Sequence, residues 1–364
     1  MSSEFVLDNP GAERVKNVAA LATRAARRKQ GAFLAEGPQS VREALTLWLR
    51  RWEPEADDVA GSQTAQRTGV DDAGEHRIQA SKPPEDYLPA LDALYFTPEA
   101  LAQHPDVEAL LDRARGVLFD PGRNLPREAR FFLREATAEV LAAMSDAETS
   151  QGLLAVCRPP AIAFEGLDSL LVGMSETFVR LAADGTTSSG LTVDYAPVRL
   201  APVLVGLQDP GNVGTVIRTA DAVGAGVVVL TPGSADPWAP KVVRAAAGSH
   251  FHVPIATGID PGELTTFLRD NQVQVLAADG HAEITLDQLQ TADAAGVRLD
   301  APTVWLLGHE AHGLTEDHQA MADARIALPL YGQAESLNVA VAGAVCLYAS
   351  AMAQHSGASG ARGR

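Results

Sequence analysis

Strand-like and helix-like segments alternate along the chain after Pro202, and this alternation is the feature that most limits the possible fold. Short apolar runs, rich in Val, Ile and Leu, are separated by helical stretches over about 150 residues. Such alternation is typical of an α/β domain with a mostly parallel sheet covered by helices on both faces. The expected strands are residues 203–207, 226–230, 251–255, 273–278, 303–307 and 325–329.

The length of the chain indicates more than one domain. Its 364 residues exceed the roughly 100 to 200 residues of a usual domain. Before Pro202, apolar spacing predicts helices at residues 15–29 and 38–51. Apolar runs predict strands at residues 32–35, 93–96, 116–119 and 152–156. We therefore expect an N-terminal α/β domain at 1–157, a linker or added subdomain at 158–201, a second domain at 202–355 and a flexible tail at 356–364.

Charge is distributed unevenly along the chain. The 29 basic and 46 acidic residues give a net charge of -17, which argues against nonspecific coating of nucleic acid. Residues 11–52 nevertheless hold nine Arg or Lys against three acids, whereas residues 53–75 hold seven acids and one Arg. The second composition is too polar to repay its ordering entropy, so we expect a disordered acidic insertion at about 53–84.

Features of a membrane or secreted protein are not evident. No run approaches 18 consecutive apolar residues, which excludes an obvious membrane span. Glu4 and Asp8 stand where a secretory signal would carry basic residues. We expect a cytoplasmic protein that has no membrane partner.

Cysteine and histidine usage indicates packing more than metal binding. Cys157 and Cys346 lie among apolar neighbours, and two cysteines cannot supply a disulfide framework or a four-ligand zinc site. His250 and His252 are interpreted as alternate residues of the strand expected at 251–255.

The first polar turn that follows an expected strand opens a helix within residues 209–224. Ligands of a doubly wound sheet bind at the carboxyl ends of strands, so its polar side chains are candidates for a site. Asn212 is placed to cap the helix, and Arg218 projects about one and a half turns later. An ordinary cap and a surface arginine explain these two residues equally well.

The second polar turn follows the strand expected at 303–307 and is flanked by glycines, which permit close approach of a ligand to the backbone. It contains His309, Glu310 and His312. Their spacing is not H-E-x-x-H and no third ligand lies nearby in sequence, so we expect no metal.

The third polar turn lies within residues 327–342 and leads into a helix. Ser336 stands in the capping position, and Asn338 reads equally well as a helix-surface residue. The helix positions expected to pack inward are Leu337, Val341, Val345 and Tyr348.

Together, and in this order, these three segments resemble the three motifs of the SpoU (TrmH-like) branch of the SPOUT RNA methyltransferases. Residues 241–249 resemble the region between the first two motifs, and the catalytic resemblance covers about 202–354. Residues 17–45, above all 31–37, are similar to the ribosomal-protein-like substrate domain of this family, and 145–156 to its last strand.

The resemblance implies a fold, a cofactor and a reaction. Family members transfer a methyl group from S-adenosylmethionine to a ribose 2′-hydroxyl of RNA, and their catalytic domain carries a deep trefoil knot that holds the cofactor. It implies that Asn212, Arg218 and Asn338 face the reacting ribose. It also implies a homodimer formed by the catalytic domain. The cofactor-binding positions that it implies are Gly308, Glu310, Leu328, Leu330, Ser336 and Leu337.

Phosphate contacts are expected from basic residues near the N-terminus and beside the first motif, because residues 201–355 hold only six Arg or Lys against sixteen acids. The expected RNA-binding residues are Arg24, Arg27, Arg28, Lys29, Lys241 and Arg244.

Rival functions differ in how well they fit the sequence. No G-x-G-x-x-G stands between a strand and a helix, which argues against a nicotinamide-dependent dehydrogenase. A noncatalytic RNA-binding relative is the stronger rival. Ribosomal RNA is the preferred substrate because the additional N-terminal domain resembles one found with rRNA enzymes, and a tRNA substrate is the alternative.

Overall fold

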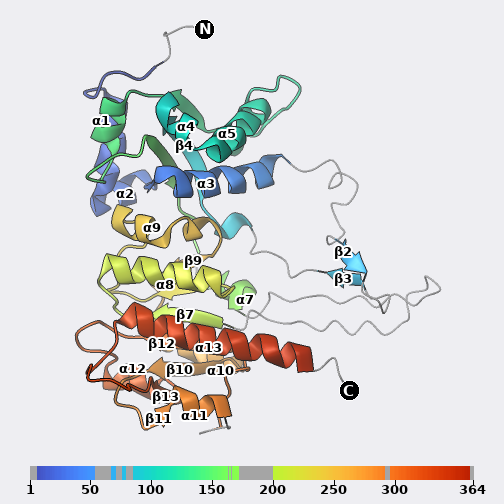
Figure 1. The fold of residues 1–364 in the computed structure, drawn as a ribbon, viewed down its shortest axis with the longest axis vertical. Coiled ribbons are helices and arrows are strands. Elements are labelled where there is room, and N and C mark those ends of the chain that lie inside the picture. The colour runs from blue at the N-terminus through green and yellow to red at the C-terminus, as the bar shows by residue number, and fades with distance from the viewer. Residues whose placement is uncertain are drawn as a thin grey trace, which may run out of the picture.

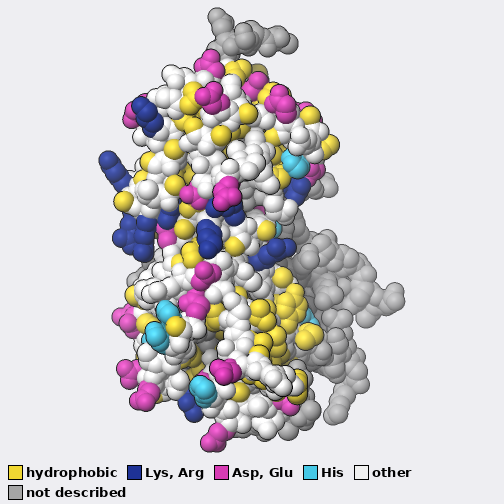
Figure 2. All heavy atoms as spheres, turned by 60° about the vertical axis from the view of Figure 1, so that its left-hand side comes forward, with side chains coloured by type: hydrophobic (Ala, Val, Ile, Leu, Met, Phe, Trp, Pro, Cys, Tyr) yellow, Lys and Arg dark blue, Asp and Glu magenta, His cyan; other side chains and the backbone are white. Residues whose placement is uncertain are grey.

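The computed structural model consists of two α/β domains that follow one another along its long axis (Figure 1). A space-filling view shows the same elongated outline (Figure 2). The structure describes residues 6–53, 67–70, 76–78, 85–162, 164, 166–171, 200–291 and 296–360.

The N-terminal domain is built on a four-stranded sheet with the order β1-β6-β4-β5. The β1–β6 and β6–β4 pairs are antiparallel, whereas β4 and β5 are parallel. The strands are β1 (Phe33–Glu36), β4 (Ala90–Phe96), β5 (Phe132–Glu135) and β6 (Leu153–Arg158). The helices are α1 (Glu13–Ala19), α2 (Arg24–Gln30), α3 (Gly37–Trp52), α4 (Pro98–Gln103), α5 (Pro105–Leu118) and α6 (Ala138–Met144).

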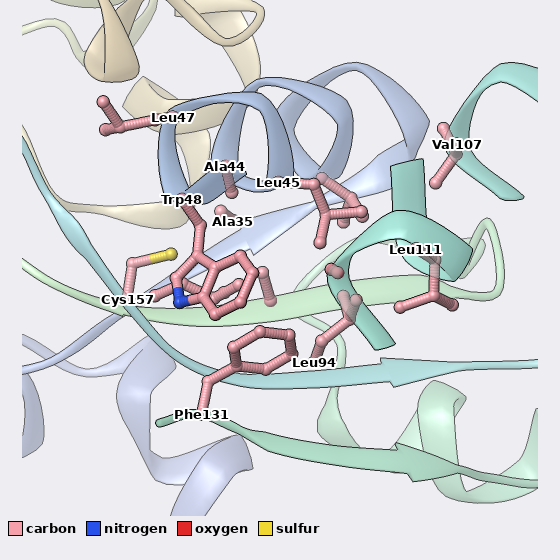
Figure 3. Close-up of a cluster of buried hydrophobic side chains, with 14 of the residues drawn as sticks. Ala35, Ala44, Leu45, Leu47, Trp48, Leu94, Val107, Leu111, Phe131 and Cys157 are labelled. Carbon is pink, nitrogen blue, oxygen red and sulfur yellow. The ribbon is translucent and has the colours of Figure 1, made fainter. Parts of the chain in front are cut away.

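The largest core cluster of this domain packs α3 and α5 against the sheet (Figure 3). The rings of Trp48 and Phe131 meet edge to face at 5.1 Å. The indole Nε1 of Trp48 donates to the carbonyl oxygen of Ala129 at 2.8 Å, so the buried polar group is satisfied. Cys157 lies in the same cluster, which confirms its interpretation as a core residue.

Two expectations for this domain are wrong. The helix expected at 15–29 is interrupted by a short 3₁₀ turn, and α2 begins anew because the Thr23 side chain accepts from the Ala26 amide. The strand expected at 116–119 is the end of α5, whose residues Val107, Leu111 and Val117 are buried at helical spacing.

The C-terminal domain contains a seven-stranded sheet with the order β11-β13-β10-β12-β7-β8-β9, in which every pair is parallel. This confirms the expected mostly parallel α/β domain, whereas the trefoil knot stays a prediction. The strands are β7 (Leu200–Leu204), β8 (Val228–Leu230), β9 (Ile255–Thr257), β10 (Gln274–Ala278), β11 (Ile284–Thr285), β12 (Thr303–Leu307) and β13 (Ala324–Ala327).

Helices cover this sheet, and α13 runs alongside α8 across one face of it (Figure 1). The helices are α8 (Pro210–Ala222), α9 (Pro240–Ala246), α10 (Pro261–Asp270), α11 (Leu286–Thr291), α12 (Glu316–Ala320) and α13 (Val339–Gly360). The strand expected at 251–255 is wrong, because residues Ser249–Phe251 form a 3₁₀ turn and β9 begins only at Ile255. His250 and His252 are therefore not alternate residues of a strand.

Three expectations about connecting segments fall partly outside the described residues. Within the expected acidic insertion, β2 (Arg67–Val70) and β3 (His76–Ile78) pair as antiparallel strands, and residues 54–66, 71–75 and 79–84 are not described. Within the expected linker, α7 (Gly166–Leu171) packs Leu167 and Leu170 into the core of the second domain. Within the expected tail, α13 continues to Gly360, and 361–364 are not described.

The two domains share a continuous interface. Val243 and Phe251 of the second domain belong to the main core cluster of the first. The ring of Phe33 in β1 lies 4.8 Å from that of Trp238. The buried guanidinium of Arg27 pairs with Asp236 of the second domain at 2.6 Å. The packing therefore fixes the N-terminal domain against α9 and the turn that precedes it.

Candidate functional site

The three polar turns meet at one edge of the seven-stranded sheet. Strands β7, β12, β10 and β13 are neighbours and parallel, so their carboxyl ends lie on the same side. The loop after β7, the turn after β12 and the loop after β13 all emerge there. Ligands of open α/β sheets bind at this kind of edge.

The first turn is held by Asp209, a residue that sequence reasoning overlooked. Its Oδ1 accepts from the Asn212 amide at 2.8 Å, so Asp209 caps α8 and the expected cap at Asn212 is wrong. Asp followed by Pro at the first helical position is a recognisable helix start and could have identified it. Asn212 is thereby left with its side-chain amide available for other contacts.

Arg218 lies on the same helix, on its exposed side. The buried face of α8 is formed by Val213, Gly214, Val216, Ile217 and Ala220. Within the described part of the chain, no hydrogen bond or ion pair engages the Arg218 guanidinium. A permanently charged group is therefore available on the helix that carries Asn212.

Glu310, in the second turn, connects the first two motifs. Its Oε1 accepts from the Asp209 amide at 2.7 Å and from the Asn212 side chain at 3.3 Å. The Gln208 amide donates to Oε2 at 3.3 Å. Partial burial alone would raise the pKa of Glu310, but these amide donors hold that pKa below its ordinary value. Glu310 is thus an ionised anchor for the loop that precedes α8.

Asn338, in the third turn, completes the connection. Its Nδ2 donates to Oδ1 of Asn212 at 2.9 Å. Its own Oδ1 accepts from the amides of Ala340 and Val341 at 2.9 and 3.2 Å, which makes Asn338 the cap of α13. The expected cap at Ser336 is wrong, and Asn338 is not simply a helix-surface residue. Residues from all three motifs therefore form one hydrogen-bonded chain, Glu310–Asn212–Asn338.

The second turn is a tight hairpin that depends on Gly308. His309 and Gly313 exchange two backbone hydrogen bonds, at 3.1 and 2.8 Å. A Cβ at Gly308 would lie 2.4 Å from the carbonyl carbon of Gly313, so a larger residue cannot be accommodated.

The two histidines of this turn lie against each other. The rings of His309 and His312 stack at 5.0 Å. Across the described ranges, no three His, Cys, Asp or Glu side chains cluster as metal ligands.

The loop after β13 presents free backbone groups next to this hairpin. Leu328 is half-buried, whereas Leu330, Ser336 and Leu337 are exposed. Between residues 329 and 337, no backbone group bonds to another described backbone group. These residues are mostly exposed, so their backbone donors and acceptors are accessible to a ligand. The cofactor positions expected from the sequence lie on this loop and on the hairpin.

Positive charge gathers where the two domains meet, at the level of α2 and α9 (Figure 2). Arg24, Arg28 and Lys29 are exposed on α2. Lys241 is exposed on α9, and its Nζ is 3.9 Å from a carboxylate oxygen of Asp209. These four residues are accessible to an anionic partner.

Two of the expected RNA-binding residues serve the domain interface instead. Arg27 is 7% exposed, and its Nη1 donates to the carbonyl oxygens of Leu21 and Ala22 while its Nε and Nη2 reach Asp236. Arg244 pairs with Asp146 of the N-terminal domain at 3.1 Å and approaches Glu36 at 3.9 Å. Arg27 is buried on Asp236 and Arg244 is held by carboxylates of the N-terminal domain, so neither guanidinium is free for a phosphate.

The exposed side of α13 corrects another expectation. Leu337 and the helix residues Val341, Val345 and Tyr348 were expected to pack inward, but they are between 41% and 49% exposed. The side that packs inward carries Cys346, Leu347 and Ser350, and Ser350 accepts from the indole of Trp305 at 3.0 Å. An apolar stripe is thus left on the surface next to α8. We define the α13 stripe as Leu337, Val341, Val345, Tyr348 and Met352.

Among the helices of the described ranges, none has the length and apolar character of a membrane span.

Sequence comparison assigns both domains. Residues 199–348 match the SpoU rRNA Methylase family, and residues 12–57 match the MRM3-like substrate binding domain. The chain is 37% identical over 153 residues to the 23S rRNA (guanosine(2553)-2′-O)-methyltransferase RlmP of Bacillus subtilis. The aligned residues make up 42% of this chain and 58% of that relative. It is 30% identical over 194 residues to the 23S rRNA (guanosine-2′-O-)-methyltransferase RlmB of Bordetella pertussis, covering 52% of this chain and 76% of the relative.

Structure comparison gives the same fold. The crystal structure of the SpoU methyltransferase AviRb from Streptomyces viridochromogenes superposes with a TM-score of 0.61 at 21% identity, covering 95% of this chain and 99% of that one. The expected family, with its catalytic domain and its substrate domain, is confirmed. With its three motifs joined at one sheet edge, this chain belongs to the SpoU rRNA methylase family.

Proposed function

We propose that this protein transfers a methyl group from S-adenosylmethionine to a ribose 2′-hydroxyl of ribosomal RNA. The observation that carries the proposal is the hydrogen-bonded chain Glu310–Asn212–Asn338, whose member Asn212 lies on the same helix as the unpaired Arg218. A noncatalytic RNA-binding relative would have no need for three motifs joined by hydrogen bonds next to a helix that carries an unpaired cation.

Arg218 is proposed to act on the nucleophile. A guanidinium is always protonated in proteins, so it makes a poor base but a strong electrostatic partner for the alkoxide that develops on the ribose oxygen. A fixed cation at that position works like the donors of an oxyanion hole. We assign the acceptance of the proton to a phosphate of the RNA. Asn212 and Asn338, oriented by each other and by Glu310, are proposed to align the ribose.

The loop of residues 328–338 and the hairpin at Gly308 are proposed to hold the cofactor. When bound, S-adenosylmethionine supplies a methyl group already activated by a sulfonium. The open backbone of residues 329–337 fits recognition of an adenosine by main-chain contacts. The steric limit at Gly308 keeps the neighbouring hairpin close to the sheet edge.

Ribosomal RNA is proposed as the substrate because the relatives named above are 23S rRNA enzymes and the N-terminal domain matches a substrate-binding family. Arg24, Arg28, Lys29 and Lys241 are the proposed phosphate contacts. Charge reversal of Arg28 and Lys29 should weaken RNA binding and flatten its dependence on salt concentration, because fewer counterions are released. Cofactor affinity should stay unchanged. An unaltered salt slope would place the RNA elsewhere.

A homodimer is part of the proposal, and the α13 stripe is its proposed interface. Exposed apolar patches on soluble proteins mark sites of association, and this one adjoins α8, which carries Arg218. Val345→Asp should produce a monomer in sedimentation while the native fold remains. A wild-type monomer at micromolar concentration would reject the dimer. A cytoplasmic location belongs to the same proposal.

Methyl transfer from labelled S-adenosylmethionine to bulk RNA tests the central claim. We expect label in ribosomal RNA and, after nuclease digestion, in a 2′-O-methylated nucleotide. Mapping of 2′-O-methyl marks in cells with and without the protein then identifies the position. Binding of RNA without any transfer of label would support the noncatalytic alternative, and label confined to tRNA would correct the substrate.

A further inference from the structure

A cavity of about 430 Å³ opens on the N-terminal domain, away from the three motifs. It lies where α1 and the end of α2 meet β1, β4 and β6. Its volume falls in the range of roughly 300 to 1,000 Å³ that is usual for small-ligand sites. Its apolar floor is formed by buried side chains that include Leu21, Ala93 and Val156. A flat apolar group could be accommodated against this floor.

The polar rim of the cavity is rich in hydrogen-bond acceptors. The carboxylates of Glu13 and Asp92 line it, together with the side chains of Asn17 and Gln30. Asp92 is half-exposed, and one oxygen lies 3.4 Å from Nε of Arg158. Two carboxylates disfavour a phosphate at this place but favour a neutral ligand that offers N–H donors.

Arg14 supplies a donor and a planar surface at the same rim. Its Cζ lies 3.8 Å from the centre of the Phe132 ring, so stacking fixes the plane of the guanidinium. Its Nη1 also donates to the hydroxyl of Tyr95 at 3.4 Å. Guanidinium planes of this kind are used to stack unpaired RNA bases.

The cavity borders the exposed cations of α2. Gln30 lines the cavity and directly follows Lys29, and Arg24 and Arg28 lie on the same helix. A polynucleotide whose phosphates contact these cations would therefore bring its bases to the rim. The floor and rim residues Leu21, Gln30 and Ala32 all lie within residues 12–57, which match a substrate-binding domain.

From this combination we propose that the cavity binds one unpaired base of the RNA substrate, and that it prefers guanine. The Watson–Crick edge of guanine offers two adjacent N–H donors for a carboxylate and one carbonyl oxygen for a guanidinium. Glu13 or Asp92 and Arg14 provide that complement. This base is distinct from the nucleotide methylated at the sheet edge, and the inference rests on the proposed function, since it requires an RNA substrate.

Binding of short oligoribonucleotides by the full-length protein tests the proposal. The probes are fluorescent uridine oligomers with a single central guanosine, inosine or uridine, because inosine lacks only the 2-amino donor. We expect the guanosine oligomer to bind about tenfold more tightly than the inosine oligomer, the scale of one good base contact. Glu13→Gln and Asp92→Asn should each reduce this ratio severalfold. The exposed Glu108→Gln on α5 removes the same charge outside the cavity and should leave the ratio unchanged.

Photo-crosslinking locates the base independently of affinity. With 6-thioguanosine in place of guanosine, we expect adducts in the peptides that contain α1 or β4. Adducts found only in the turns after β12 and β13, or equal guanosine-to-inosine ratios in the wild type and the two cavity variants, would overturn the proposal. If the protein methylates RNA but shows no such ratio, only the cavity assignment fails. If it neither binds nor methylates RNA, the proposed function fails with it.

Discussion

The side-chain amide of Asn338 donates to Oδ1 of Asn212 at 2.9 Å across 126 positions of sequence. The Nδ2 of Asn212 is in turn directed at Glu310. Asn212 therefore has one acceptor contact and one donor contact, and only one orientation of its amide satisfies both. The pair fixes the third motif against the first, at the place where the proposed reaction needs a ribose to be aligned.

Asn338 has two roles that substitution can separate. Asp at this position still caps a helix but cannot donate to Asn212. Asn338→Asp should therefore keep the thermal unfolding midpoint within a few degrees while lowering single-turnover methylation by about tenfold to a hundredfold. Asn338→Ala should lose both roles and about 1 kcal/mol of folding free energy. Equal activity of the Asp variant and the wild type would show that the Asn212 contact does not matter for the reaction.

Arg27 should behave as a structural residue. Removing one partner of a buried ion pair leaves the other charge uncompensated, so Arg27→Ala should lower the unfolding free energy by about 3 kcal/mol. Arg28→Ala, next to it but exposed, should change stability by less than about 0.5 kcal/mol. Chemical denaturation of both variants measures the difference. Similar stabilities would show that the contact between Arg27 and Asp236 contributes little to the domain interface.

His252 links the domains in a way that depends on pH. Its Nδ1 lies 2.9 Å from Asp221 on α8, and its Nε2 lies 3.1 Å from Glu43 on α3. The carboxylate of Asp221 and then that of Glu43 raise the pKa of His252 to about 9 from its ordinary 6.5. The protonated ring therefore stabilises the folded state fully below pH 6.5, and this contribution is lost as pH rises through about 9.

His252→Gln should remove that dependence. Between pH 6.5 and 9, the wild type should lose roughly 1 kcal/mol of unfolding free energy more than the variant, a value reduced for solvent screening of a partly exposed group. Denaturation curves at several pH values give the comparison. The expectation fails if the two proteins show parallel stability profiles over this range.

Much of the fold could be predicted from periodicity and turn residues. Strand β12 was expected at its observed bounds, because a fully buried parallel strand is a continuous apolar run between polar turns. The strand expected at 116–119 was wrong because four apolar residues cannot distinguish a strand from the end of a buried helix. Longer-range spacing from Val107 to Val117 contained the helical signal.

Three residues that the candidate site brings together were named from the sequence, whereas Asp209 and all of the contacts were not. The motifs indicated Asn212, Glu310 and Asn338, whereas their hydrogen bonds depend on strand order across the sheet. The orientation of α13 was not predictable from sequence, because this helix is apolar around most of its circumference and its exposed stripe resembles a core face. Likewise, the residues that flank Arg27 and Arg28 in the sequence do not show which of the two is buried. The partner of Arg27 is the carboxylate of Asp236, which lies 209 positions away.

Arg218 provides the sharpest test of the mechanism. It is exposed on α8, the helix that also carries Asn212, and no described residue neutralises its charge. If that charge acts mainly on the developing alkoxide, Arg218→Ala should reduce single-turnover methylation by about a hundredfold or more while cofactor binding and most RNA affinity remain. Arg218→Lys should restore little, because an ammonium lacks the two-point geometry of a guanidinium.

The control for Arg218 is Arg127→Ala, which removes an exposed arginine from the N-terminal domain. It should keep near-normal turnover, so that a loss in the Arg218 variant cannot be ascribed to net charge. Calorimetric titration with S-adenosylmethionine and thermal melts establish that both variants are folded and bind cofactor. Near-normal single-turnover methylation by folded Arg218→Ala would remove this residue from the mechanism, because a transition-state contact cannot be deleted without a cost in rate.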